Sequence, residues 1–369
     1  MPNPKLTTCL FVVAVLLACA VGPAAHGQEA LKNRWEITPE SERALQMGLE
    51  YLARSQGDKG NWNNEDLGLV SLGMLAFLAD GHAPGHGKYG PAVKKSLDYI
   101  MANAKPSGLL NIPGHQEMYN HGLTTFVLGQ AYGMTDDRRV GPALDRALKL
   151  IAKCQGPSGG WDYTAAPGEH DLSLCVMQAK ALRSAVDSGF EVPPAVIEAA
   201  IGHVRGKFAS EGWDGQGGEE EQKKHPGRFT YAGNIGGGSV AMAAAGVVCL
   251  QELGQYDDWR IAKSIDFIEA SLKDITDKPG NNLPFDAYTM YYVAQSLYQV
   301  GGEPWKRSYP KLRDRVVISQ THTAAQNGSW GGDLFTTSVC CFVVAIPNRY
   351  LPILQEGKID SVRKQLEPK

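Results

Sequence analysis

Cysteine is scarce in this sequence, and its spacing excludes a fold stapled by disulfides. Seven of the 369 residues are cysteine, and no two of them form a CxxC pair. Two lie within the first twenty residues, and the others stand within or at the ends of apolar helical runs: Cys154, Cys175, Cys249, Cys340 and Cys341. An odd number of thiols among apolar neighbours is typical of buried free cysteines. We therefore expect no disulfide framework and no metal site.

An excess of positive charge is also lacking. Lysine and arginine number 36 against 39 aspartates and glutamates, which gives a net charge of -3 and an isoelectric point near 6.3. Such a chain has no basic surface that would attract nucleic acid, so we expect neither DNA nor RNA as a partner. The content of 43% hydrophobic and 20% charged residues is that of a globular protein with a large core. No motif indicates a cofactor, and none is expected.

No apolar run after residue 21 is long enough to span a bilayer. The earlier run, 10–21, follows a positive residue and precedes the small-x-small site Ala25-His26-Gly27, so residues 1–27 are predicted to be an export signal. The alternative is a lipoprotein signal, because Leu16-Leu17-Ala18-Cys19 approaches a lipobox. The protein is thus expected to be periplasmic or secreted, and tied to a membrane only if Cys19 is lipidated.

The sequence is rich in one unit, a helix followed by a turn and a second helix. Its clearest copy joins the runs 148–155 and 172–182 through the turn Gln155 to Trp161. The turns Gln56 to Trp62 and Gln326 to Trp330 repeat it, and 105–108, 210–213 and 277–280 are weaker copies. One glycine per turn recurs at separations of 48, 52, 52, 68 and 48 residues: Gly60, Gly108, Gly160, Gly212, Gly280 and Gly328. This period indicates six helical hairpins.

The two helices of each predicted hairpin differ in composition. First helices, which carry more charge, are expected at 42–55, 93–104, 143–153, 194–208, 259–273 and 306–320. Second helices, richer in small and apolar residues, are expected at 67–79, 118–132, 172–188, 239–253, 285–300 and 335–346. This asymmetry predicts an outer and an inner ring, an all-α (α/α)6 toroid.

The predicted toroid occupies residues 41–355. A polar lead-in, 28–40, precedes it, and a polar tail, 356–369, follows it. The glycine-rich stretch 215–238 interrupts the fourth hairpin and lengthens its repeat. Such a loop in a compact repeat protein is either a solvated insertion or a lid over a site.

The Gln-to-Trp turns resemble the repeats of the squalene cyclase and protein prenyltransferase superfamily. Met118 to Met134 and Thr336 to Ile353 further resemble an exported bacterial branch of it. The resemblance covers about residues 41–355 and implies a terpenoid cyclase-like toroid with a central cavity. It does not extend to the known activities, because the Asp-x-Asp-Asp acid motif of squalene-hopene cyclases and the thioester motif of complement-like toroids are absent. Asp171-Leu172-Ser173 also places serine where the prenyltransferases have a zinc-binding cysteine.

Candidate catalytic residues stand at the expected starts of the inner helices. Asp171 could act as a general acid or anchor a polar ligand, and its structural alternative is a helix N-cap. His121 could transfer protons beside a carboxylate, and its alternative is a histidine bonded to a turn carbonyl. Asp286 begins the fifth inner helix. It would pair with Asp171 in a carbohydrate-active enzyme, because glycoside hydrolysis uses two facing carboxylates.

Four candidate ligand contacts lie near the same helix starts: Tyr119, His170, Tyr288 and Tyr292. Together with the tryptophans of the turns, the tyrosines could line a cavity with aromatic faces that stabilise cations. The alternative for the tryptophans is that they staple the turns between helices.

The function expected from these features is an exported terpenoid cyclase- or prenyltransferase-like toroid whose apolar cavity binds or acts on an isoprenoid-type or other apolar ligand. As an enzyme it would be a cyclase, a mutase or a transferase. The export signal counts against isoprenoid diphosphates, because they are made in the cytoplasm. Two alternatives stay open. One is a non-catalytic scaffold that binds a ligand, a protein or a polysaccharide, and the other is a carbohydrate-active (α/α)6 enzyme.

Overall fold

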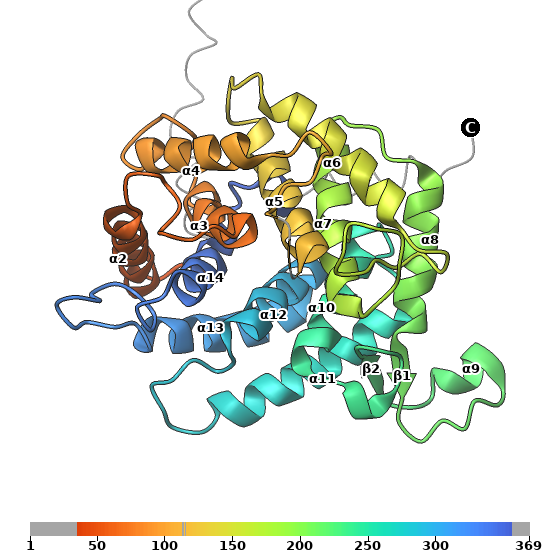
Figure 1. Ribbon diagram of the computed structural model, residues 1–369. Coiled ribbons are helices and arrows are strands. Elements are labelled where there is room, and N and C mark those ends of the chain that lie inside the picture. The colour runs from red at the N-terminus through yellow and green to blue at the C-terminus, as the bar shows by residue number, and fades with distance from the viewer. Residues whose placement is uncertain (1–34, 113, 115, 356–369) are drawn as a thin grey trace, which may run out of the picture.

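In the part of the chain that the computed structural model describes, twelve long α-helices alternate between an outer and an inner ring (Figure 1). The structure describes residues 35–112, 114 and 116–355. Each hairpin contributes its first helix to the outer ring and its second helix to the inner ring. The predicted all-α (α/α)6 toroid is confirmed.

The helices fall into two sets of six. The outer helices are α2 (Pro39–Ser55), α4 (Gly90–Asn103), α6 (Val140–Cys154), α8 (Pro194–Gly206), α11 (Trp259–Thr276) and α13 (Gly302–Ile318). The inner helices are α3 (Leu67–Ala79), α5 (Glu117–Tyr132), α7 (Leu172–Asp187), α10 (Val240–Glu252), α12 (Ala287–Val300) and α14 (Leu334–Ala345). The short elements are β1 (Phe208–Ser210), α9 (Gly218–Gln222), β2 (Gly227–Phe229) and the 3-10 turns η1 (Ile235–Gly237), η2 (Ile346–Asn348) and η3 (Pro352–Leu354).

Burial separates the two rings. In the inner helix α3 every residue except Leu69 is buried. In the outer helix α6 the buried residues recur every three or four positions, as at Leu144, Ala147 and Ile151. A helix that lacks a polar face is stable only when other helices surround it, so the composition of each helix decides which ring it joins.

The inner ring is closed. Each inner helix packs against the next one in the chain, and α14 returns to pack against α3. In Figure 1 the red end of the colour scale, at α2 and α3, therefore lies beside the blue α14. Closure covers the apolar face that each hairpin would expose alone.

Glutamines of three turns tie neighbouring outer helices together. The side-chain amide of Gln56 donates to the carbonyl of Ala92 in α4 at 2.7 Å, and that of Gln155 donates to a carbonyl of α8 at 2.9 Å. The third tie comes from Gln320, which donates to Ala44 of α2 at 2.8 Å and so joins the last hairpin to the first. Gln326, with which the predicted last turn begins, is exposed and does not make this tie.

The tryptophans of the same turns cap the outer helices. Trp62, Trp161 and Trp330 each donate their indole N–H to a carbonyl in the last turns of their own outer helix, at 2.7 to 2.9 Å. Trp161 and Trp330 are buried, and Trp62 is partly exposed. These tryptophans therefore staple the turns and do not line a cavity. Trp213, in the weaker fourth turn, bonds only to Gln216 in its own loop.

Glycine is required where a turn touches the next outer helix. Gly159 and Gly328 both have a positive φ, of 93° and 89°. A Cβ at Gly159 would lie 2.0 Å from the carbonyl oxygen of Ala199 in α8, and one at Gly328 would lie 2.3 Å from that of Met47 in α2. Only a residue without a side chain fits there.

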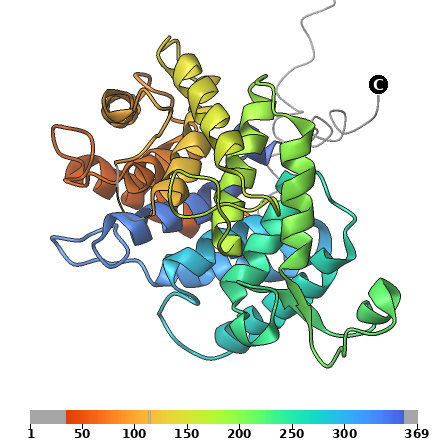
Figure 2. The same cartoon turned by 45° about the vertical axis from the view of Figure 1, so that its right-hand side comes forward.

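The stretch 215–238 forms a small projection on the outer ring. β1 and β2 pair antiparallel, with Phe208 opposite Phe229, and Figure 2 shows α9 standing away from the body of the toroid. Glu219 of α9 accepts a hydrogen bond from Trp259 and pairs with Arg260, both in α11. The insertion is thus attached to the outer ring through α9, and β2 and the residues after it approach the inner ring, with Phe229 against Gly246 of α10.

The predicted signal, 1–27, and the polar tail, 356–369, lie outside the described residues. Within the described part of the chain, no helix is both long and apolar enough to cross a membrane. The five cysteines found there are free and buried, as expected.

Candidate functional site

A cavity of about 630 Å³ lies at the end of the toroid where the inner helices begin. The first turns of α3, α5, α7, α12 and α14 contribute to its wall. Its polar lining consists of Asp66, Gln116, Asn120, Ser173 and five tyrosines, Tyr119, Tyr163, Tyr231, Tyr288 and Tyr291. The cavity is therefore mixed in character, with aromatic faces between hydrogen-bonding groups.

Two of the tyrosines come from loops that are fixed to the inner helices. The carbonyl of Tyr163 accepts a hydrogen bond from the first turn of α5, through Met118. Tyr231 lies just after the three-residue strand β2, and its carbonyl accepts a hydrogen bond from the N–H of Leu172 at the start of α7. The end of the 215–238 stretch thus borders the cavity, although most of the stretch does not.

Asp66 is the carboxylate in the cavity wall. Its Oδ1 accepts the N–H groups of Gly68 and Leu69, so it caps α3, and its Oδ2 accepts a 2.7 Å hydrogen bond from the side-chain amide of Asn120. A Cβ at Gly68 would lie 2.4 Å from the amide oxygen of Asn120, so the glycine makes room for this contact. The pair offers an acceptor and an amide side by side.

Burial holds the hydroxyls of Tyr119, Tyr288 and Tyr291 in their protonated form, because it raises the pKa of each. The hydroxyls of Tyr119 and Tyr292 lie 3.0 Å apart, and the ring of Tyr288 meets that of Tyr292 edge-on. Burial raises the pKa of the Tyr119 and Tyr288 hydroxyls well above the usual value. Tyr291 is buried, and its hydroxyl has no hydrogen-bond partner among the described residues. Neutral hydroxyls of this kind both donate and accept hydrogen bonds.

Asp171 caps α7 and stands behind two residues of the cavity wall. Its Oδ1 accepts the N–H of Ser173 at 2.8 Å and also the Ser173 hydroxyl, and its Oδ2 accepts from Tyr163 and faces Nδ1 of His170, each at 3.0 Å. Burial raises the pKa of Asp171, but the hydrogen bonds outweigh it and the net pKa is lowered. Asp171 is therefore an anion at neutral pH, and the proposed role of general acid does not suit it.

His121 does not line the cavity. Its Nδ1 accepts the N–H of Leu110 at 3.0 Å, so Nε2 carries the proton and donates to the carbonyl of Ala147 at 3.2 Å. Full burial lowers the pKa of His121 to about 4. Both nitrogens are occupied, which makes it a structural histidine that joins α5 to α6.

The remaining candidates lie at or beyond the edge of the cavity. Asp286 is an exposed N-cap that accepts from Thr289, so it does not face Asp171 across the cavity as a carbohydrate-active pair would require. His170 is exposed beside Asp171, with its ring edge-on to that of Tyr163. Tyr119 and Tyr288 line the cavity, and Tyr292 supports both. Sequence analysis missed Asp66, although its position before an inner helix is the signal that identified Asp171.

Comparisons with known proteins identify the fold. No family model and no curated protein matches the sequence. Among solved structures, the chain is similar to the α-1,6-mannanase GH76A of Salegentibacter sp. HEL1_6, in an inactive variant with α-1,6-mannotriose, at 12% identity and a TM-score of 0.55, over 85% of this chain and 100% of that one. A second inactive variant, solved with α-1,6-mannotetrose, is 12% identical with a TM-score of 0.55, over 86% of this chain and 100% of that one. The structure of the mannanase itself is 11% identical with a TM-score of 0.53, over 85% of this chain and 100% of that one.

These neighbours correct the family predicted from the turns. They are (α/α)6 mannanases, so the expected resemblance to the squalene cyclase and protein prenyltransferase superfamily, with its terpenoid cyclase-like function, is wrong. In this chain the glutamine ties and tryptophan caps join helices of the toroid at three turns, so they serve the architecture and do not indicate terpenoid chemistry.

Adjacent aspartates were replaced in the inactive mannanase variants. This chain has two such pairs, Asp136-Asp137 and Asp257-Asp258, and both follow the C-terminal end of an inner helix, at the opposite end of the ring from the cavity. A hydrogen bond from Arg139 lowers the pKa of Asp137 to about 2. Asp258 caps α11 and is paired with arginines. Neither pair is part of the tyrosine-lined cavity.

Proposed function

We propose that this protein binds an oligosaccharide in the tyrosine-lined cavity. The observation that carries the proposal is the alternation in the cavity wall of tyrosine faces with Asp66, Asn120 and Ser173. A sugar ring has C–H groups on its faces, which pack on aromatic rings, and hydroxyls at its edges, which need donors and acceptors. The volume, about 630 Å³, is within the range of roughly 300–1,000 Å³ for ligand pockets.

The same wall does not suit the apolar ligand expected from the sequence. An apolar ligand would give no partner to polar atoms of the wall such as the Tyr291 hydroxyl, which has none among the described residues, and would displace water from the others. Each such group costs about 1–3 kcal/mol. A polyhydroxylated ligand satisfies them. The similarity of the fold to mannanases solved with α-1,6-mannotriose and α-1,6-mannotetrose supports the saccharide and supplies the probes.

A second candidate function is hydrolysis of the bound glycoside, and it is favoured by two carboxylates beside the cavity. Asp171 stays ionised because of its hydrogen bonds, so it would act as the base or stabilise positive charge on the sugar. Asp66 has one oxygen bonded only by the amide of Asn120, and it would be the second carboxylate that reaches the sugar. Binding does not require this step, and the two are separable.

The test is a calorimetric titration with α-1,6-mannotriose and α-1,6-mannotetrose. The variant Asp66→Asn keeps an N-cap but loses a charged acceptor, and a hydrogen bond to a charged group contributes about 1.5–3 kcal/mol, so affinity should fall at least tenfold. Asp333→Asn is the matched control, because Asp333 caps α14 in the same way and is not in the cavity wall.

Three outcomes separate the candidates. Weaker binding in Asp66→Asn with normal binding in Asp333→Asn supports the cavity as the site. Shorter saccharides released by the unaltered protein and absent with Asp66→Asn would support hydrolysis as well. No heat with either probe or with other oligosaccharides, or equal effects of both variants, would refute the proposal.

A further inference from the structure

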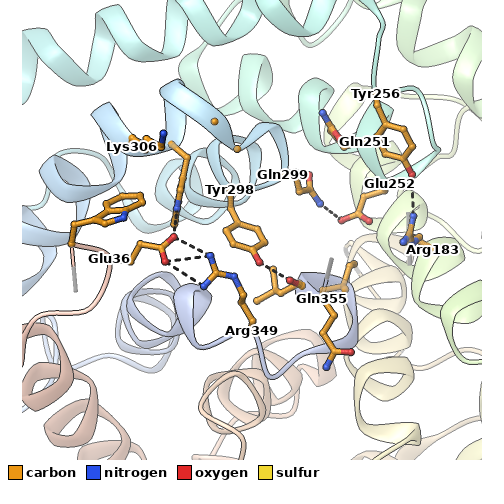
Figure 3. Close-up of a pocket in the computed structure, with 16 residues that line it drawn as sticks. Glu36, Arg183, Gln251, Glu252, Tyr256, Tyr298, Gln299, Lys306, Arg349 and Gln355 are labelled. Carbon is orange, nitrogen blue, oxygen red and sulfur yellow. Dashed lines mark hydrogen bonds and ion pairs between the residues drawn. The ribbon is translucent and has the colours of Figure 1, made fainter. Parts of the chain in front are cut away.

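A second pocket, of about 420 Å³, lies at the other end of the ring (Figure 3). It is lined by the C-terminal ends of α7, α10 and α12, by the start of α13 and by segments 35–36 and 349–355. No residue belongs to the walls of both this pocket and the tyrosine-lined cavity. It is therefore a separate space in the molecule.

The charged side chains that frame this pocket are paired within the protein, with one another or with a residue behind the wall. Glu36 is buried and accepts from the indole of Trp305 at 2.6 Å and from Arg349 at 3.1 Å. Arg183 donates to Asp187 at 2.9 Å. Because these charges are neutralised within the protein, the pocket has no excess of either sign with which to select an ion.

Polar atoms near the right-hand side of Figure 3 lack partners. Both hydrogen bonds to Glu252, from Lys180 and Gln299, go to Oε1, which leaves Oε2 without a partner among the described residues. Oε1 of Gln299 is buried and also unpaired. The side chain of Gln251 is 7% exposed and lines the pocket, and none of the described residues bonds to its amide. The unpaired groups here are therefore a carboxylate oxygen, the amide oxygen of Gln299 and the amide of Gln251.

Aromatic faces complete the pocket. Trp35 is 36% exposed, and Tyr298 lies between the Glu36 pair and the Glu252 group in Figure 3. Trp305 stacks on Tyr309 and meets the ring of Tyr298 edge-on, so ring contacts and the hydrogen bond to Glu36 fix its orientation. A ligand here meets flat apolar faces on one side and unpaired donors and acceptors on the other.

We infer that this pocket is a second binding site, for one or two neutral sugar residues. Vicinal hydroxyls donate to the free oxygens of Glu252 and Gln299 and accept from the amide of Gln251, and the ring packs on Trp35 or Tyr298. The pocket itself indicates a neutral polyol. The choice of a sugar rests on the proposed function, and the site would hold a saccharide to the face opposite the cavity.

The test uses tryptophan fluorine resonances, because tryptophans line this pocket and none lines the tyrosine-lined cavity. The protein from Gln28 to Lys369, labelled with 5-fluorotryptophan, is titrated with D-mannose and α-1,6-mannobiose. Both sugars should shift the Trp35 signal, which Trp35→Phe identifies, in a saturable way. Glycerol at equal concentration should leave it in place.

Variants decide where the sugar binds. Gln251→Leu should weaken the response at least tenfold, whereas Asp66→Asn in the cavity should not change it. If Gln251→Leu fails to fold, Trp35→Ala, which alters an exposed residue, should weaken the response read at Trp305. A Trp35 signal unmoved by either sugar, a response equal to that with glycerol, or a midpoint unchanged in the folded variants would overturn the inference. Because the signals do not report on the cavity, failure here and failure of the proposed function are distinguishable.

Discussion

At the scale of single residues, burial decides the protonation state of the His121 imidazole. His121 is fully buried and both of its nitrogens are bonded to backbone groups. A second proton on Nδ1 would replace an acceptor by a donor that faces the N–H of Leu110. The folded protein therefore holds the neutral imidazole, and its pKa falls to about 4.

This predicts a loss of stability in mild acid. Between the unfolded pKa of about 6.5 and the folded pKa of about 4, the unfolded chain binds the proton and the folded one does not, so stability falls as the pH falls through this window. The contribution lost from pH 7 to pH 5 is about 2 kcal/mol. Urea unfolding at the two pH values measures it.

The variant His121→Gln isolates this group. Whatever its stability at pH 7, the variant should lose about 2 kcal/mol less than the unaltered protein on going to pH 5. An identical loss in both proteins would show that the buried imidazole is not responsible.

The aspartates that begin inner helices show what sequence can and cannot specify at this scale. Asp66, Asp171, Asp286 and Asp333 all act as N-caps, as their positions before apolar helical runs indicate. Of these, Asp66 lines the cavity. Which cap faces the cavity depends on the path of the loop before it and on a partner 54 residues away, Asn120, and neither follows from local pattern.

At the scale of the element, the turn between an outer and an inner helix is a joint with three parts. The glutamine reaches the next outer helix, the tryptophan caps its own, and a glycine lets the two come close. Because the joint brings two outer helices close together, a side chain at its glycine should lower the stability through a clash with the next helix as well as through the positive φ.

Gly159 and Gly189 form a matched pair for this prediction. They have similar positive φ, 93° and 83°, but a Cβ at Gly159 would lie 2.0 Å from the Ala199 carbonyl whereas one at Gly189 would meet nothing within 4 Å. Gly189→Ala should cost about 1–2 kcal/mol for its backbone conformation alone. Gly159→Ala should cost about 1–3 kcal/mol more. Equal thermal or urea stabilities of the two variants would contradict the joint.

Helix positions were predictable because the apolar period and the turn residues are local. The largest displacement is at the start of α13, which begins at Gly302 instead of 306. The last turn is predicted to begin with Gln326, but the glutamine that makes the tie is Gln320, which reaches α2, at the far end of the chain. A contact between residues 276 positions apart, such as Gln320 to Ala44, cannot be predicted from the local sequence of either segment.

At the scale of the whole molecule, the alternating hairpins give the ring two unlike ends. All inner helices run in the same direction, so the N-termini of five of them line the cavity and the C-terminal ends of α7, α10 and α12 line the second pocket. The sequence predicted this architecture but not the family, because the turns report the toroid and not its chemistry. Tyr231, which arrives from the 215–238 stretch, could not be assigned to the cavity without the fold.

Export of the toroid remains a prediction, and we propose it because residues 1–27 have the charge, apolar run and small-x-small site of an export signal. Intact mass of the protein recovered from its native cell envelope or medium should correspond to a start near Gln28 without added lipid. A start at a diacylated Cys19 would instead identify a lipoprotein held at a membrane.

The most direct test of the central claim is a crystal structure of the protein soaked with α-1,6-mannotriose. The account predicts sugar density in the tyrosine-lined cavity, with a ring face against Tyr119, Tyr288 or Tyr291 and a hydroxyl within hydrogen-bond distance of Asp66. An empty cavity in crystals that bind the sugar elsewhere, or a cavity filled only when an apolar ligand is supplied, would contradict it.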